Sequence, residues 1–126
     1  MLRLIVPVLY MLCIYLLSSI PGELVDKSTT GFVLSIVPSS LQNLLHVPLY
    51  AGLSWSYIWA SHRVKFNKSN KYAITFMACT LFAASDEIHQ MNVIGRYGSL
   101  SDFVLDIIGI SIGLLITEYK LTTSDY

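Results

Sequence analysis

The chain has 126 residues, zero formal net charge, 54% hydrophobic residues and 13% charged residues, and its mean hydropathy is +0.60. Average soluble domains contain roughly 45–50% apolar and about 25% charged residues, so this composition argues against an ordinary soluble domain and is typical of a membrane protein. The balanced charge gives no support to a nucleic-acid partner.

The apolar residues fall in long blocks separated by short polar breaks, with no internal repeat, so we expect a single domain over residues 1–126. Cys13 and Cys79 both lie inside apolar runs, where a thiol packs as a small hydrophobe. Two cysteines without a C-x-x-C pair predict neither a disulfide framework nor a zinc site.

The first apolar run, Leu4 to Leu17, predicts a helix over about residues 2–20, close to the roughly 20 residues that cross a bilayer. Pro21 follows and no A-x-A-like site precedes it, so a retained anchor helix is favoured over a cleaved signal peptide. The connection Pro21 to Asn43 contains an apolar patch at 32–37. That patch is too short to cross a membrane, so we expect it to lie in the interface or to re-enter the bundle.

A capping-box pattern, Ser39 to Gln42, predicts the start of a second helix over about residues 40–61. Polar side chains recur along it at spacings of three and four, which places them on one face. They are Asn43, His46, Tyr50 and Ser54. Pro48 removes a backbone donor from this helix.

The next connection, His62 to Lys71, is basic and contains no acid. Under the positive-inside rule a short loop of this kind stays in the cytoplasm. A third helix is predicted over about residues 72–90 and ends in the polar run Asp86 to Gln90; Gly95 and Gly98 then indicate a turn.

Ser99 followed by Asp102 predicts the cap of a fourth helix over about residues 100–119. Asp102, Asp106, Gly109 and Gly113 follow at spacings of four, three and four, so they form one stripe. The G-x-x-x-G step within it suits close contact with another helix.

Four helices joined by short connections predict an all-α, antiparallel four-helix transmembrane bundle. With the basic connection inside, both termini are expected to be cytoplasmic. The start of the second helix, the end of the third and the start of the fourth then meet at one end of the bundle, on its outer side.

Acids inside a membrane helix cost about 2.5–3.5 kcal/mol each on insertion scales, so they usually face the interior and find partners. Asp106 is the clearest case, because it lies one turn past the cap. Two pairings are open: Arg96 with Asp86, Glu87 or Asp102, or His46 sharing a proton with one acid. The residues expected to form the binding cluster are His46, Tyr50, Asp86, Glu87, Gln90, Arg96, Asp102 and Asp106.

These motifs resemble those of the VanZ-like family of small bacterial membrane proteins. The matching pieces are H-x-x-x-Y-A from His46, D-E-x-x-Q from Asp86, Arg96, and S-x-x-D-x-x-x-D-x-x-G-x-x-x-G from Ser99. The chain departs from the family pattern at Gln42 and Asn43, where an Asp-Lys pair is expected, and at Asp106, where asparagine is usual. The resemblance implies an integral protein of the bacterial cytoplasmic membrane and a connection with low-level teicoplanin resistance.

Several functions fit the predicted cluster. The first is binding or modification of a lipid or glycan head group, with Arg96 as the anion contact and His46, Glu87 and Gln90 as hydrogen-bonding groups. The second is a hydrolase or transferase acting on a lipid-linked substrate, with His46, Glu87 and Asp86 as the catalytic candidates. In that case His46, Asp86, Glu87, His89 and Asp102 are also ligand types that suit a divalent cation.

A proton or ion relay and a purely structural plug are further alternatives. No established catalytic motif is present, because D-E-I-H-Q is not H-E-x-x-H. The sequence therefore assigns no cofactor and no metal, and leaves open whether the protein is an enzyme.

Overall fold

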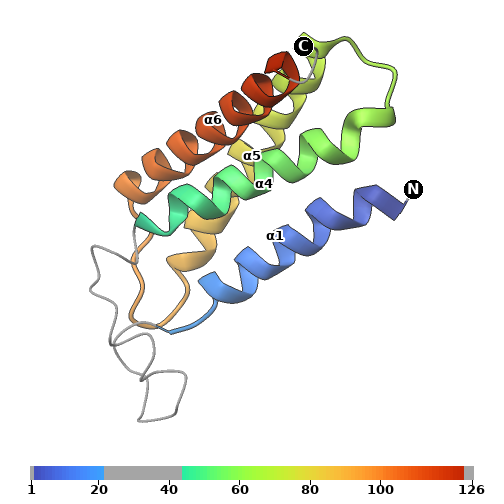
Figure 1. Cartoon of the computed structure of the whole chain (residues 1–126). Helices are drawn as coiled ribbons and strands as arrows, with labels where there is room; N and C mark the ends of the chain where they lie inside the picture. Colours follow the sequence, from blue (N-terminus) through green and yellow to red (C-terminus); the bar gives the residue numbers. More distant parts are fainter. Residues whose placement is uncertain (1, 22–43, 124–126) are drawn as a thin grey trace.

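The computed structural model describes residues 2–21 and 44–123 (Figure 1). All regular structure in these ranges is helical, in agreement with the predicted all-α fold. The elements are a 3-10 turn η1 (Leu2–Leu4), α1 (Ile5–Ser18), α4 (His46–Ala60), a 3-10 turn η2 (Ser61–Arg63), α5 (Lys68–Gln90) and α6 (Leu100–Thr123). The predicted interfacial segment and the Ser39–Gln42 capping box lie outside the described residues.

Side-chain contacts fix the directions of the helices. Tyr10 of α1 lies against Gly52 of α4, and Arg3 lies 4.8 Å from the ring centroid of Trp59 further along α4, so these helices are antiparallel. α4 and α6 run in the same direction past α5, which runs against both (Figure 1). The alternating up-down order is the predicted one.

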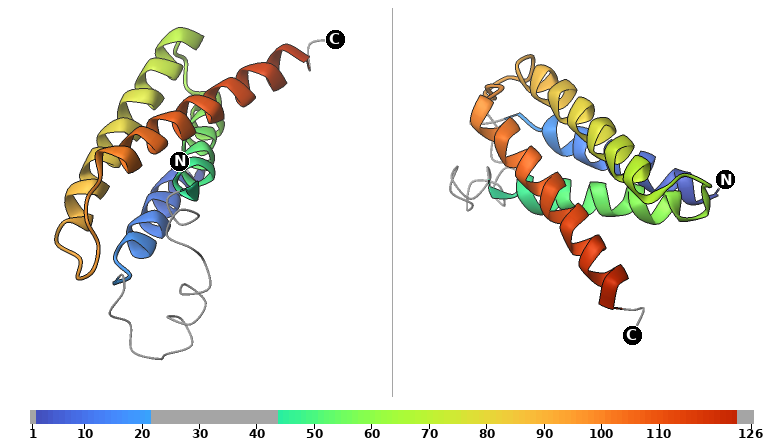
Figure 2. Two further views of the ribbon diagram at one scale, coloured as in Figure 1. Left: turned by 90° about the vertical axis from the view of Figure 1, so that its left-hand side faces the viewer. Right: turned by 90° about the horizontal axis from the view of Figure 1, so that it is seen from above.

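As a result, the end of α1, the start of α4, the end of α5 and the start of α6 gather at one end of the molecule. α6 runs obliquely to the other helices (Figure 2). The small apolar core lies between them and includes Ile14, Tyr50, Leu53, Cys79 and Ile110.

The predicted start of the third helix was wrong by one turn. α5 begins at Lys68, because Asn67 has an extended backbone and its side chain accepts a hydrogen bond of 2.7 Å from the Asn70 N–H. That is the geometry of an N-cap. Lys68 and Lys71 therefore lie on a helix, and the basic connection is shorter than predicted. α6 also continues to Thr123, past the predicted end near residue 119.

The glycine stripe of α6 packs directly on the backbone of α4. A Cβ atom at Gly109 would lie 2.4 Å from the Val47 carbonyl oxygen, and one at Gly113 would lie 2.3 Å from the Ala51 carbonyl oxygen. Both distances are shorter than any side chain tolerates. The close helix contact predicted from G-x-x-x-G is confirmed, and its partner is α4.

α6 is the one helix among the described residues that is both long and apolar enough to cross a membrane. Its stretch Leu100–Lys120 has 21 residues, and an 18-residue window within it has a mean hydropathy of 1.9. α1 is apolar but has 14 residues. α5 has 23 residues, but lysines lie near its start and acids near its end. Helix length and hydropathy alone do not establish the four spans predicted above.

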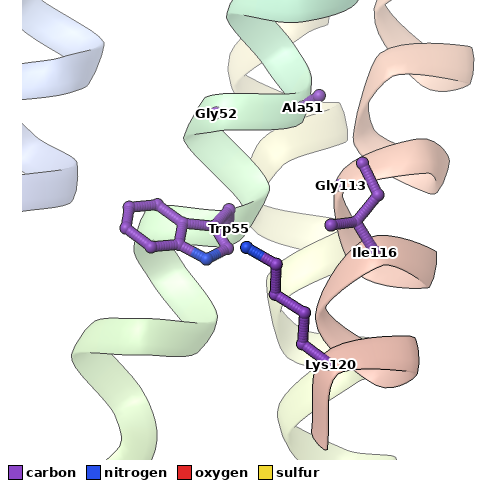
Figure 3. Close-up of a pocket in the computed structure, with 6 residues that line it drawn as sticks. All are labelled: Ala51, Gly52, Trp55, Gly113, Ile116 and Lys120. Carbon is purple, nitrogen blue, oxygen red and sulfur yellow. The ribbon is translucent and has the colours of Figure 1, made fainter. Parts of the chain in front are cut away.

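An open groove of about 300 Å³ lies between α4 and α6. Ala51, Gly52, Trp55, Gly113, Ile116 and Lys120 line it, as Figure 3 shows. It follows from the same small residues that bring the two helices together, and it lies toward the C-terminal parts of both.

Replacing Gly109 by alanine tests this packing. In a free helix the change stabilises by roughly 1 kcal/mol, but here the new methyl group meets the Val47 carbonyl. We expect Gly109→Ala to lower the free energy of unfolding by about 1–3 kcal/mol, the usual cost of overpacking. Thermal unfolding of the purified protein measures it. Leu115→Ala, at a site 68% exposed on the same helix, should change little, and a more stable Gly109→Ala variant would contradict the packing.

Candidate functional site: a buried acidic cluster

His46 and Asp106 form a buried pair between α4 and α6. His46 Nδ1 and Asp106 Oδ1 lie 2.7 Å apart, and the side chains are 14% and 0% exposed. The His46 ring is nearly parallel to the ring of Tyr50, with centroids 6.3 Å apart. Of the two pairings considered from the sequence, the one between the histidine and an acid is therefore observed.

Glu87 links the end of α5 to the start of α6. Its Oε2 accepts a hydrogen bond of 2.7 Å from the Ser99 backbone N–H, while the Ser99 hydroxyl accepts from the Ser101 N–H. Ser99 thus caps α6 as predicted. The acid that bonds the N–H of the capping residue comes from another helix, however, and is not Asp102 as in a local capping box.

Gly98 allows this arrangement. A Cβ atom there would lie 2.6 Å from the Glu87 carbonyl oxygen, so the chain passes very close to the end of α5 immediately before Ser99. Gly95 has a φ of 74°, a left-handed conformation that glycine adopts without strain. The two glycines of the predicted turn therefore place Ser99 within reach of Glu87.

Asp86 collects hydrogen bonds from three helices on one oxygen. Its Oδ2 accepts from the Ser18 hydroxyl at 2.8 Å, from Gln90 Nε2 at 3.2 Å and from the Tyr50 hydroxyl at 3.4 Å. The donors belong to α1, α5 and α4. Ser18 was not predicted as a member of the cluster, although the Ser18-Ser19 pair that ends the first apolar run was the available signal.

Each of the four acids also keeps one oxygen that is buried and has no hydrogen-bond partner among the described residues. These atoms are Asp86 Oδ1, Glu87 Oε1, Asp102 Oδ1 and Asp106 Oδ2. Buried polar atoms are nearly always paired, and an unpaired one costs about 1–3 kcal/mol, more when it is charged. Four such oxygens at one end of a small bundle indicate a binding site for a ligand.

Three side chains of types that can bind a metal ion lie close together. One donor atom from each of His46, Glu87 and Asp106 lies within 4.8 Å of the others. The three side chains come from α4, α5 and α6, so the group depends on the tertiary fold and not on a local motif.

Arg96 and His89 stand apart from this group. Arg96 is half-buried in the connection between α5 and α6, and it forms no ion pair with any acid in the described ranges. The alternative pairing with Asp86, Glu87 or Asp102 is therefore not observed. His89 Nε2 lies 2.9 Å from the Ser19 hydroxyl, and its ring packs on Tyr15. The end of α1, and not the acid cluster, holds His89.

The other end of the bundle has no comparable group among the described residues. The hydroxyls of Ser56, Ser61, Ser111 and Thr117 bond to carbonyl oxygens of their own helices. Lys68 and Glu118 form an exposed ion pair there. The asymmetry predicted from the sequence is therefore present in the fold.

A family model described as VanZ/LLP1 matches residues 4–121 of the chain, nearly its whole length. The chain belongs to the VanZ/LLP1 family. The resemblance noted from the motifs is thereby confirmed, and the match includes the buried cluster and the glycine stripe of α6. No curated protein and no solved structure gives a significant match to this VanZ/LLP1 chain.

Proposed function

We propose that the protein is a single-domain, multi-pass protein of the bacterial cytoplasmic membrane whose buried cluster binds the polar head group of a lipid or lipid-linked glycan. Membrane insertion is supported by the surface of the helices. Large apolar side chains on every helix face outward, among them Leu9 on α1, Trp55 on α4, Leu81 on α5 and Leu115 on α6. Soluble monomers rarely expose apolar surface on this scale.

The orientation follows from the distribution of lysine and arginine. Arg63, Lys65, Lys68 and Lys71 lie at or near the connection between α4 and α5, at the end opposite the cluster, where Arg3 also lies. The positive-inside rule puts that end in the cytoplasm. Both termini are then cytoplasmic, and the cluster opens toward the outer leaflet.

The four unpartnered carboxylate oxygens carry the binding proposal. They are hydrogen-bond acceptors, so they suit the hydroxyl groups of a glycan or the ammonium group of a lipid. Arg96 lies in the connection between Glu87 and Ser99, and no described acid neutralises its charge. A phosphate in the same head group would provide the anion that a guanidinium prefers.

Cysteine labelling tests the topology. Single cysteines replace Tyr97, which is 86% exposed in the α5–α6 connection, or Lys65, which is exposed between α4 and α5, in a background carrying Cys13→Ser and Cys79→Ala. In intact bacterial cells an impermeant maleimide should label the first variant, and the second only after permeabilisation. The reverse pattern, or protein recovered in the soluble fraction, would contradict the proposal.

Binding is tested with protein extracted from bacterial membranes in mild detergent. Native mass spectrometry should show a bound lipid or lipid-linked glycan on the wild type. Glu87→Gln and Arg96→Ala should lower its occupancy by about tenfold or more, which corresponds to the loss of one charge-assisted hydrogen bond of about 1.5–3 kcal/mol. Glu118→Gln and Lys65→Ala change the same charges at the other end of the bundle and should retain it.

The same variants give a cellular readout. Expression of the wild type should raise the teicoplanin concentration that inhibits growth, and the two cluster variants should lose this protection while still reaching the membrane. Equal occupancy and equal protection in wild-type and cluster-variant cells would exclude the cluster as the binding site.

A further inference from the structure

Three helices each bring one metal-ligating side chain to the same point. His46 comes from the first turn of α4, Glu87 from the last turn of α5, and Asp106 from the second turn of α6. Their donor atoms lie within 4.8 Å of one another. A cluster of acids alone does not identify a ligand. The carboxylate oxygens that have no hydrogen-bond partner give the additional evidence.

Two of the three residues have a carboxylate oxygen without a hydrogen-bond partner. Asp106 Oδ1 contacts His46 and Glu87 Oε2 accepts from Ser99, but Asp106 Oδ2 and Glu87 Oε1 are buried without a partner. Asp106 is 0% and Glu87 is 7% exposed. Water therefore does not reach these oxygens freely, and a bound cation would give them the partner that they lack.

The charges around the group favour a cation as well. Asp86 and Asp102 are buried at the same end, so four carboxyl groups gather there. The only side chain that forms an ion pair with any of them within the described ranges is His46. Buried carboxylates are stable when they are paired or coordinate a metal. A divalent ion would supply the positive charge that the described protein groups do not.

We propose that His46, Glu87 and Asp106 bind a divalent metal ion. Carboxylates alone suit Mg²⁺ or Ca²⁺, whereas the imidazole favours a first-row transition ion such as Zn²⁺ or Mn²⁺. Ligand atoms in a tetrahedral site with bonds of about 2.0–2.2 Å lie about 3.3–3.6 Å apart. The three donor atoms, which lie within 4.8 Å of one another, therefore have to approach by up to about 1.5 Å, which requires rotation of the side chains.

Three ligands leave coordination positions open for water or for an oxygen of a bound head group. The ion would bind whether or not a head group follows, so the metal site goes beyond the proposed function and can be tested separately from it. His89, Asp86 and Asp102, which also had suitable ligand types in the sequence, are not part of this set.

The test uses the purified full chain in detergent, stripped with a chelator and then titrated with Zn²⁺ or Mn²⁺ in the absence of added lipid or glycan. Calorimetry and elemental analysis should give one ion per chain. Asp106→Asn and His46→Gln should weaken binding by at least about tenfold, since loss of even an outer-shell partner costs 10–100-fold. Mg²⁺ should bind more weakly than either transition ion.

His62→Gln and Glu118→Gln serve as controls, because His62 is exposed and Glu118 pairs with Lys68 at the far end. Both should bind the ion as the wild type does, which excludes adventitious surface binding. A wild type that takes up no stoichiometric ion overturns the proposal, even if the variants fail to fold. It is equally overturned if Asp106→Asn and His46→Gln bind as tightly as the wild type. Neither result affects head-group binding, which is measured without added metal.

Discussion

The contact between His46 and Asp106 joins the two helices on which the fold depends most. Asp106 is completely buried, so its carboxyl group needs a partner, and the imidazole provides one at 2.7 Å. Breaking a buried pair by removing one member usually costs about 3–5 kcal/mol, because the remaining group is left without compensation. The pair therefore fixes how α4 and α6 lie against each other at the cluster end.

The glycines of α6 allow this contact to form. Gly109 and Gly113 let the helix approach the α4 backbone at Val47 and Ala51, and Asp106 lies one turn before Gly109 on the same stripe. Backbone contact and ion pair thus belong to one interface. Because the register of the small residues sets the register of the polar ones, a shift by one turn would separate His46 from Asp106.

A second contact in the cluster links α5 to α6. Glu87 bonds the Ser99 N–H at the first turn of α6, which satisfies a backbone donor that helices otherwise leave free. The same carboxyl group keeps its other oxygen for the cluster. One side chain therefore both positions α6 and contributes to the candidate site.

Much of this could be predicted from the sequence. The four helices followed from apolar runs and capping patterns, and their alternating order and the convergence of His46 with the acids followed from the short connections. The close contact made by Gly109 and Gly113 followed from their spacing. The pairings could not be predicted, because the sequence does not say which acid the imidazole will contact. It also does not say that Arg96 forms an ion pair with none of the acids in the described ranges.

Two further features depend on tertiary contacts that leave little local signal. Ser18 donates a hydrogen bond to Asp86, which lies 68 positions away in the chain. Glu87, and not Asp102, accepts from the N–H of the capping residue Ser99. The start of α5 at Lys68 was missed for a different reason. The Asn67 cap was present in the sequence, but the charged first turn was interpreted as a loop.

The most direct test of this account is a double-mutant cycle on His46 and Asp106, measured as free energies of unfolding in chelator so that no metal contributes. The wild type, His46→Ala, Asp106→Ala and the double variant should give a coupling energy of about 1–3 kcal/mol, as expected for residues in direct contact. Pairing His46→Ala with Glu118→Ala at the far end should give additive changes within about 0.5 kcal/mol. Additive changes for His46 and Asp106 as well would contradict the buried pair and the cluster built around it.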